Sequence, residues 1–282
     1  MILDGKSYSN KIKDEVRDEA KKLIKKHKIV PKLAVVLVGD DAPSKIYVNN
    51  KKTACAYVGF DSVEVLLPAT ISQSMLEQKL EELNNDKSVN GILLQLPLPK
   101  GLDEQSALNK ISPLKDVDGL TKQSLGLLVS GEKCLSACTP TGIMMALKEY
   151  GVELEGKNVV IINRSLLVGK PLMHLMLNAN ATVTICHSRT KNLAEHTKRA
   201  DIVVTAVGKK GFLTADMIKK GAVVIDVAIV RTDDGIFGDA DFDKVSKKAS
   251  LITPVPGGVG PLTIATLMRN TLTAFKMQNN IN

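Results

Sequence analysis

A continuous apolar run, Leu33-Ala34-Val35-Val36-Leu37-Val38, lies between Lys32 and Gly39. Uninterrupted apolar residues rich in valine are typical of a parallel strand that is buried on both faces of its sheet. Residues 6–28 before this run carry a helical pattern, and a helix that contains Tyr47 and Lys51 is expected after it. Helix and strand therefore alternate from the start of the chain, which favours an α/β fold.

The alternation continues along the whole chain. A strand is predicted over 62–67, a helix over 74–83 and a buried strand over 91–96, followed by a helix near 122–130. A second series of strands is predicted at 157–163, 181–186, 201–206 and 222–227, and their spacing is that of a doubly wound sheet. We therefore predict two α/β domains, at residues 1–121 and 122–261, with a C-terminal helix over 262–282 that completes the first domain.

The composition indicates the class of protein. The chain has 282 residues, of which 44% are hydrophobic and 24% charged, as in globular proteins. It shows neither an apolar run long enough to span a bilayer nor the layout of a signal peptide, so we expect a cytoplasmic protein without a membrane partner. The net charge is +8, but the chain has no tryptophan and no recognisable nucleic-acid-binding motif. A small anionic ligand fits this charge better than nucleic acid does.

Four cysteines are too few for a disulfide framework in a chain of this size. The spacing of Cys134 and Cys138 matches no common zinc pattern, so we expect reduced thiols and no metal site. Cys138 is a candidate to line a site, because the segment Thr139-Pro140-Thr141-Gly142 that follows it is expected to be a loop.

The helix that follows the first strand carries two residues of chemical interest. Pro43 and Ser44 mark its start, with Ser44 as the expected cap, and Gly59 marks its end. Tyr47 and Lys51 are four residues apart and so lie on one face. A lysine beside an aromatic ring suits proton transfer next to a planar ligand. The surface of an ordinary amphipathic helix explains the same pair, and the spacing alone leaves both interpretations open.

The second series of strands has features of a dinucleotide site. The turn after residues 157–163 lacks the G-x-G-x-x-G fingerprint, but a helix starting near Pro171 is expected to offer free N–H groups to a phosphate. His187, Ser188 and Arg189 stand where NAD enzymes commonly place an acidic residue that binds the ribose. Together with Arg164 they favour NADP over NAD, because Ser and Arg can bind a 2′-phosphate. Exposed loop surface is the alternative interpretation of both arginines.

Several motifs occur together in one order along nearly the whole chain. They are Tyr47 with Lys51, Gly91-Ile92-Leu93-Leu94-Gln95-Leu96-Pro97-Leu98-Pro99, Lys115-Asp116-Val117-Asp118-Gly119, Cys138-Thr139-Pro140-Thr141-Gly142, Arg164-Ser165 with Val168-Gly169-Lys170-Pro171, Cys186-His187-Ser188, and Pro254-Val255-Pro256-Gly257-Gly258-Val259-Gly260-Pro261. In these segments and their order, the chain resembles the bifunctional methylenetetrahydrofolate dehydrogenase/cyclohydrolase family.

The resemblance implies an activity and an architecture. It implies NADP-dependent oxidation of 5,10-methylenetetrahydrofolate to 5,10-methenyltetrahydrofolate, then hydrolysis to 10-formyltetrahydrofolate, within the one-carbon metabolism that serves purine biosynthesis. It also implies a homodimer, and in each chain an N-terminal catalytic domain and a Rossmann-like dinucleotide-binding domain with the active site in the cleft between them.

The same resemblance assigns roles to residues. Lys51 is implied to be the catalytic lysine, Gln95 its partner, Tyr47 a ring that packs on the folate, and Asp118 the anchor of the pterin. The segment Pro256, Gly257 and Gly258 is implied to bind substrate. The implied cofactor-binding residues are Asn163, Arg164, Ser165, Ser188, Arg189 and Ile229. Two departures from the family pattern bear on cofactor affinity, since Asn163 and Ala228 both stand where the family usually has glycine.

The chemistry of the two steps suits these residue types. A nicotinamide accepts the hydride in the first step, and the folate nitrogens stabilise the cation that remains, so that step needs no strong protein base. The second step needs proton transfers, for which Lys51 is suited if its pKa is lowered towards neutrality.

Two other functions remain compatible with the residues. A degenerate relative that binds folate or nucleotide without turnover is one. An NADP dehydrogenase of the amino-acid or shikimate type is the other, but it explains neither residues 95–99 nor residues 254–261.

Overall fold

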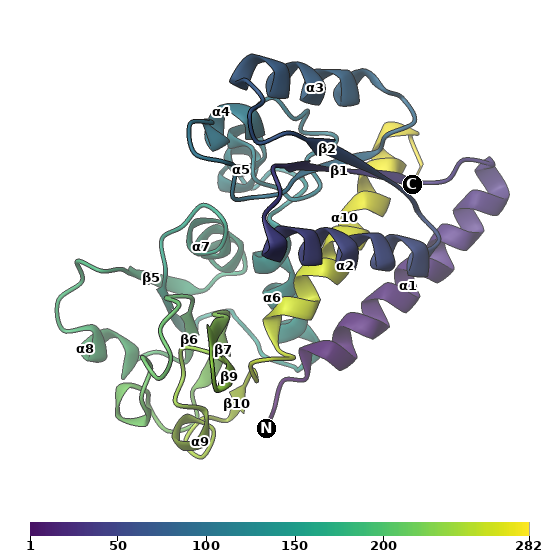
Figure 1. Ribbon diagram of the computed structural model, residues 1–282. Coiled ribbons are helices and arrows are strands. Elements are labelled where there is room, and N and C mark those ends of the chain that lie inside the picture. The colour runs from purple at the N-terminus through teal and green to yellow at the C-terminus, as the bar shows by residue number, and fades with distance from the viewer. Residues whose placement is uncertain (282) are drawn as a thin grey trace. The chain divides into compact units, whose positions relative to one another are not determined.

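Separate parallel sheets organise the chain in the computed structural model, which describes residues 1–281 (Figure 1). The chain divides into two units. Unit 1 comprises Met1–Ser9 and Thr139–Thr263, and unit 2 comprises Asn10–Cys138 and the chain from Ile264 onward. The last position of the helix predicted over 262–282 lies outside the described residues. Among those residues, none of the helices combines the length and the apolar character that a bilayer crossing needs.

The sheet of unit 2 has three parallel strands in the order β2-β1-β3. They are β1 (Lys32–Val38), β2 (Asp61–Leu67) and β3 (Gly91–Leu94), which confirms the strands predicted in this half of the chain. Figure 1 shows helices α2 (Ala42–Val58) and α3 (Gln73–Asn85) on opposite sides of β1 and β2. Alternate residues of β1 point to one face, where they form a core with three leucines of α3. That core includes Ala34, Val36, Val38, Leu76, Leu80 and Leu83.

Further helices complete unit 2. They are α1 (Gly5–His27), α4 (Glu104–Leu108) and α5 (Lys122–Val129), together with α10 (Val259–Gln278) from Ile264 onward. Two polar side chains of α10 reach backbone carbonyls of this unit. Asn270 donates to the carbonyls of Val117 at 2.9 Å and Ser136 at 3.0 Å, and Gln278 donates to the carbonyl of Asn90 at 2.7 Å. These bonds anchor α10 beside the segment that leads to Asp118.

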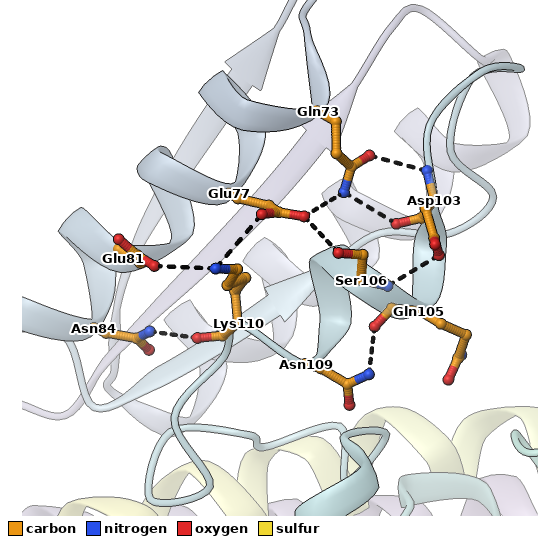
Figure 2. A network of polar contacts seen from close by, with 9 residues as sticks. All are labelled: Gln73, Glu77, Glu81, Asn84, Asp103, Gln105, Ser106, Asn109 and Lys110. Carbon is orange, nitrogen blue, oxygen red and sulfur yellow. Dashed lines mark hydrogen bonds and ion pairs between the residues drawn. The ribbon is translucent and has the colours of Figure 1, made fainter.

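A polar network ties α3 to the segment that contains α4 (Figure 2). The Glu77 carboxylate accepts hydrogen bonds from Gln73 at 2.7 Å and from the Ser106 hydroxyl at 2.6 Å, and it pairs with Lys110 at 3.5 Å. These hydrogen bonds lower the pKa of Glu77. The network lies outside the candidate site, and its role is to hold α4 onto the core of unit 2.

The sheet of unit 1 has five parallel strands in the order β10-β7-β6-β4-β5. They are β4 (Asn158–Ile162), β5 (Thr182–Cys186), β6 (Ile202–Thr205), β7 (Val223–Asp226) and β10 (Leu251–Ile252), and β4 to β7 were predicted. Helices α7 (Gly169–Asn178) and α8 (Leu193–Thr197) and the 3-10 turn η1 (Ala215–Met217) connect them. After β5 the chain crosses to the other side of β4 to form β6. The carboxyl ends of β4 and β6 therefore flank the switch point of the sheet, which is where doubly wound folds bind ligands.

Several elements of unit 1 were not predicted. The hairpin of β8 (Val230–Thr232) and β9 (Gly235–Phe237) and the short helix α9 (Phe242–Val245) follow β7. The N-terminal residues pair with β10, where Leu3 donates to the carbonyl of Ile252 at 2.8 Å. The loop predicted at 139–142 is instead the first turn of α6 (Cys138–Glu149). Pro140 is compatible with that turn because the first N–H groups of a helix have no partner within it.

Candidate functional site

Helix α2 presents Tyr47 and Lys51 from one face, one turn apart. The expected cap was wrong. Asp41 caps this helix, and its carboxylate accepts the Ser44 N–H at 2.9 Å and the Ser44 hydroxyl at 2.7 Å. A carboxylate is a stronger acceptor than a hydroxyl at a helix start, where the dipole also favours negative charge. Ser44 is thereby buried, while Tyr47 keeps 39% of its surface exposed.

Gln95 holds the amine of Lys51. The Lys51 Nζ donates to the Gln95 Oε1 at 2.6 Å, and the Gln95 Nε2 donates to the carbonyl of Leu96 at 2.7 Å. A carbonyl can only accept, so it fixes the amide with its oxygen towards the lysine. Gln95 directly follows the buried strand β3, and it acts as a neutral acceptor that orients the amine of Lys51.

Buried polar side chains hold the loop that carries Asp118. Lys115 donates to the carbonyls of Leu83 at 3.0 Å and Asp86 at 2.7 Å. The Asp116 carboxylate accepts the Thr121 N–H at 2.9 Å and the Ser124 hydroxyl at 2.7 Å. Both side chains are nearly fully buried, so their hydrogen bonds are costly to break.

Electrostatics connects Lys51, Asp118 and Cys138. Burial lowers the pKa of Lys51, although the charge of Asp118 acts in the opposite direction. Burial likewise raises the pKa of Asp118 against the attraction of Lys51. Burial and the adjacent Asp118 raise the pKa of Cys138 well above its usual value, so this thiol stays protonated. Desolvation exceeds charge attraction in both partners, so the pKa of Lys51 lies below that of an ordinary lysine, which favours proton transfer by its amine.

In unit 1, three of the predicted cofactor residues follow neighbouring strands. Arg164 comes two residues after β4, and Ser188 and Arg189 come shortly after β5, with Ile162 paired to Cys186 at the ends of the two strands. All three are exposed. No ion pair engages either arginine within the described chain, so both guanidinium groups are available to an anion. This chemistry fits a phosphate at the carboxyl edge of the sheet.

The turn after β4 is built around Asn163, and it corrects one expectation. The Asn163 Oδ1 accepts the N–H groups of Ser165 at 2.8 Å and Gly169 at 3.0 Å. A Cβ on Gly169 would come within 2.2 Å of the Asn163 backbone oxygen, so this approach needs glycine. The backbone N–H of Lys170 donates to the Ser165 carbonyl at 3.0 Å, and Pro171 has no N–H. The start of α7 therefore does not offer the free N–H groups that were expected to bind phosphate.

The remaining candidate residues belong to the segments after β7 and β10. Ile229 is 46% exposed and follows the buried Ala228. The Ala228 N–H donates to the Asp226 carboxylate at 3.1 Å. Gly257, in the segment that also contains Pro256 and Gly258, accepts the Lys6 N–H at 2.8 Å. The structure thus brings Lys51, Gln95 and Asp118 together in unit 2, whereas the segment 256–258 belongs to unit 1.

Asp226 makes the stability of the protein depend on pH. Burial raises the pKa of this carboxyl from 3.8 to about 6. The folded protein therefore binds the proton more tightly than the unfolded chain, and the stability that this proton contributes is present below about pH 4 and lost as the pH rises through about 6. Two units of pKa correspond to about 3 kcal/mol.

The variant Asp226→Asn does not titrate at this position. We expect the unfolding free energy of the parent, relative to this variant, to fall by about 2.5 kcal/mol between about pH 4 and about pH 7.5. Urea denaturation of both proteins at the two pH values measures this change. A difference that stays constant with pH would show that Asp226 titrates normally.

Sequence reasoning did not find all of the residues that shape these sites. It missed the structural roles of Lys115, Asp116, Asp226 and Asp239, four buried charged side chains. Asp226 carried a signal, since it directly follows a buried apolar run. The partners of Lys115 and Asp239 lie far away in the sequence, and no spacing within the chain indicates them. Asp116 instead binds Thr121 and Ser124, which follow it closely in the sequence.

Comparisons with known proteins match both halves of the chain. Residues 3–118 match the catalytic domain of tetrahydrofolate dehydrogenase/cyclohydrolase, and residues 137–279 match its NAD(P)-binding domain. A relative from Nitrosopumilus maritimus, described as bifunctional protein FolD, is 54% identical over 99% of this chain and 98% of its own length.

Solved structures agree with these matches. The crystal structure of the bifunctional enzyme FolD from Campylobacter jejuni is 46% identical, with a TM-score of 0.97, and the match covers 98% of this chain and 99% of that one. A dehydrogenase–cyclohydrolase from Trypanosoma brucei, solved with NADP cofactor and an inhibitor, is 38% identical with a TM-score of 0.93 and covers 98% and 97% of the two chains. The chain belongs to the tetrahydrofolate dehydrogenase/cyclohydrolase family.

Proposed function

We propose that this protein oxidises 5,10-methylenetetrahydrofolate to 5,10-methenyltetrahydrofolate with NADP and then hydrolyses that product to 10-formyltetrahydrofolate. One observation carries the proposal. The Lys51 side chain is half-buried, its amine is fixed by Gln95 at 2.6 Å, and desolvation lowers its pKa in the part of the chain that matches the family's catalytic domain. A desolvated and oriented amine suits the proton transfers of the second step.

In the first step the chain's residues bind and orient the reactants. NADP, when bound, supplies the acceptor for a hydride from the methylene bridge. Arg164, Ser188 and Arg189 are the residues that we assign to its phosphate, and we assign Ile229 to the cofactor as an exposed apolar contact. Asn163 and Ser165 shape the turn that bears Arg164, and the Ser165 hydroxyl can still donate to a ligand while it accepts the Val168 N–H.

In the second step Lys51 moves protons. As water attacks the bridge carbon of the methenyl cation, the neutral amine takes one of the water protons. The resulting ammonium returns that proton to the folate N5 as the bond from N5 to the bridge carbon breaks. The remaining hydroxyl proton goes to solvent as the formyl carbonyl forms on N10, so one proton is released overall. Gln95 keeps the amine in place throughout and adds no charge that would raise its pKa.

Residues near Lys51 in the catalytic half are assigned to folate binding. We propose that Asp118 accepts two hydrogen bonds from the pterin, for which a carboxylate is a natural partner. Tyr47 is exposed on the same helical face as Lys51 and can pack on a planar ring. We also assign Pro256, Gly257 and Gly258 to the substrate, as the family resemblance implies.

The cofactor assignment predicts a loss of selectivity in Arg164→Ala. We expect the parent to bind NADP more tightly than NAD by about 1.5–3 kcal/mol, because charged hydrogen bonds hold the 2′-phosphate. The variant should lose most of that margin and keep its use of NAD. Steady-state kinetics with both cofactors measure the effect, with Arg231→Ala, an exposed arginine of β8, as the matched control. Equal efficiency with NAD and NADP in the parent would contradict the assignment.

A protein that binds folate without turnover is the second candidate function, favoured by the departures at Asn163 and Ala228. Within the turn, however, Asn163 satisfies two N–H groups and does not disrupt it. Formation of NADPH from methylenetetrahydrofolate distinguishes the two functions. A homodimeric state, a cytoplasmic location and the domain boundaries at residues 121 and 261 stay predictions.

A further inference from the structure

The carboxylate of Asp239 is fully buried and accepts four hydrogen bonds. Its Oδ2 accepts the Thr205 hydroxyl at 2.6 Å and the Val207 N–H at 2.6 Å. Its Oδ1 accepts the N–H groups of Gly208 at 2.8 Å and Lys209 at 2.7 Å. Three successive N–H groups therefore converge on one carboxylate, and Gly208 supports this curvature with a φ of 82°. Such a concavity of N–H groups is an anion-binding nest, here filled by the protein's own acid.

This nest lies at the switch point of the five-stranded sheet. It follows β6, which pairs with β4, while β5 pairs with β4 on the other side. The Asn163 Nδ2 donates to the carbonyl of Ala206 at 2.7 Å, so a side chain after β4 is bonded directly to the loop after β6. Doubly wound folds bind their dinucleotides above this pair of loops.

A second carboxylate extends the frame to the loop after β7. Asp226 accepts the N–H of Ala240, the neighbour of Asp239, at 2.7 Å, and the N–H of Ala228 at 3.1 Å. The space around Asp226 is tight, since a Cβ on Gly238 would lie 2.1 Å from its Oδ2. Hydrogen bonds thus join the loops after β4, β6 and β7 through side chains that face the protein interior.

We propose that Asp239 is a positioning residue for the dinucleotide. It fixes the loop of residues 206–209 and satisfies the N–H groups of that loop. A cofactor phosphate therefore does not bind this loop and binds Arg164, Ser188 and Arg189 instead. The residue does not touch the cofactor itself. This inference rests on the proposed placement of NADP on unit 1.

The test compares Asp239→Ala and Asp239→Asn with the parent. The amide of the Asn variant can still accept from Gly208 and Lys209, but its NH₂ group then faces the Val207 N–H, so the conservative variant should recover part of the function. We expect Asp239→Ala to raise both the KM for NADP and the Kd from direct NADP titration by about tenfold or more, and Asp239→Asn to raise them by about threefold or more. The KM for folate and the hydrolysis of methenyltetrahydrofolate without NADP should stay within about twofold.

The control is Asp243→Ala, which removes an exposed acid four residues further along and should leave both NADP constants unchanged. An unaltered NADP Kd in Asp239→Ala would overturn the inference. Loss of hydrolysis in Asp239→Ala would show that this variant does not fold. The Kd of Asp239→Asn for NADP then serves as the test, and an unaltered value would likewise overturn the inference. A parent that binds NADP but forms no NADPH would contradict the proposed function alone, because the effect of Asp239 on the NADP Kd would still be measurable.

Discussion

Lys51→Met is expected to reduce the hydrolysis of methenyltetrahydrofolate by about a hundredfold or more, the usual contribution of a general acid–base group. Methionine fills a similar volume and stays compatible with burial, but it can neither take nor give a proton. Folate binding should remain measurable in the variant, since Tyr47 and Asp118 are intact. The oxidation step should fall less, to the extent that Lys51 also helps to place the substrate.

Lys52 offers the matched control for this experiment. It follows Lys51 in the same helix, but its amine is exposed and pairs with Glu64 at 2.8 Å. Lys52→Met should therefore hydrolyse methenyltetrahydrofolate at the parental rate. The rates of the parent and both variants are measured from methenyltetrahydrofolate without cofactor, after subtraction of the uncatalysed reaction. Substantial hydrolysis by Lys51→Met would exclude Lys51 as the proton-transfer group.

Asp118→Ala is expected to weaken folate binding by about 2–4 kcal/mol, as the loss of a charged contact with two hydrogen bonds should. NADP binding should change little. The variant also removes a charge that raises the pKa of Lys51. The pKa of Lys51 should therefore fall, and the acid limb of the pH profile for hydrolysis should move to lower pH.

Titration of each ligand separately and a pH profile at saturating folate measure these two effects. Asp61→Ala, at the exposed first residue of β2, is the control that should change neither. The opposite pattern, with NADP binding weakened and folate binding intact, would show that Asp118 serves the cofactor.

The regular elements were the most predictable part of the fold. Buried parallel strands are continuous apolar runs, and β1 and β4 stand out from their polar flanks for that reason. The hairpin β8–β9 and the two-residue strand β10 were missed because such short elements carry little periodicity. The helix α6 was missed because Pro140 and Gly142 suggest a loop, whereas a proline is compatible with the first turn of a helix.

The candidate site was predictable to a different extent in its two parts. The positions of Lys51, Gln95 and Asp118 followed from the family motifs, and the structure brings the three together. Which side chain forms a hydrogen bond with which backbone group could not be predicted. Asn163 shows this well, because its amide organises the turn after β4 through groups as distant in sequence as Ala206.

A double isotope label tests the central claim most directly. The parent enzyme is given NADP and methylenetetrahydrofolate with two deuterium atoms on the bridge carbon, in water enriched in oxygen-18. We predict that NADPH carries one deuterium and that the formyl group of the product carries one deuterium together with oxygen-18. The two labelled products should form in equal amounts, and the labelled formyl product should form faster than with Lys51→Met. NADPH without deuterium, or labelled formyl product that forms no faster than with Lys51→Met, would contradict oxidation and hydrolysis by this one protein.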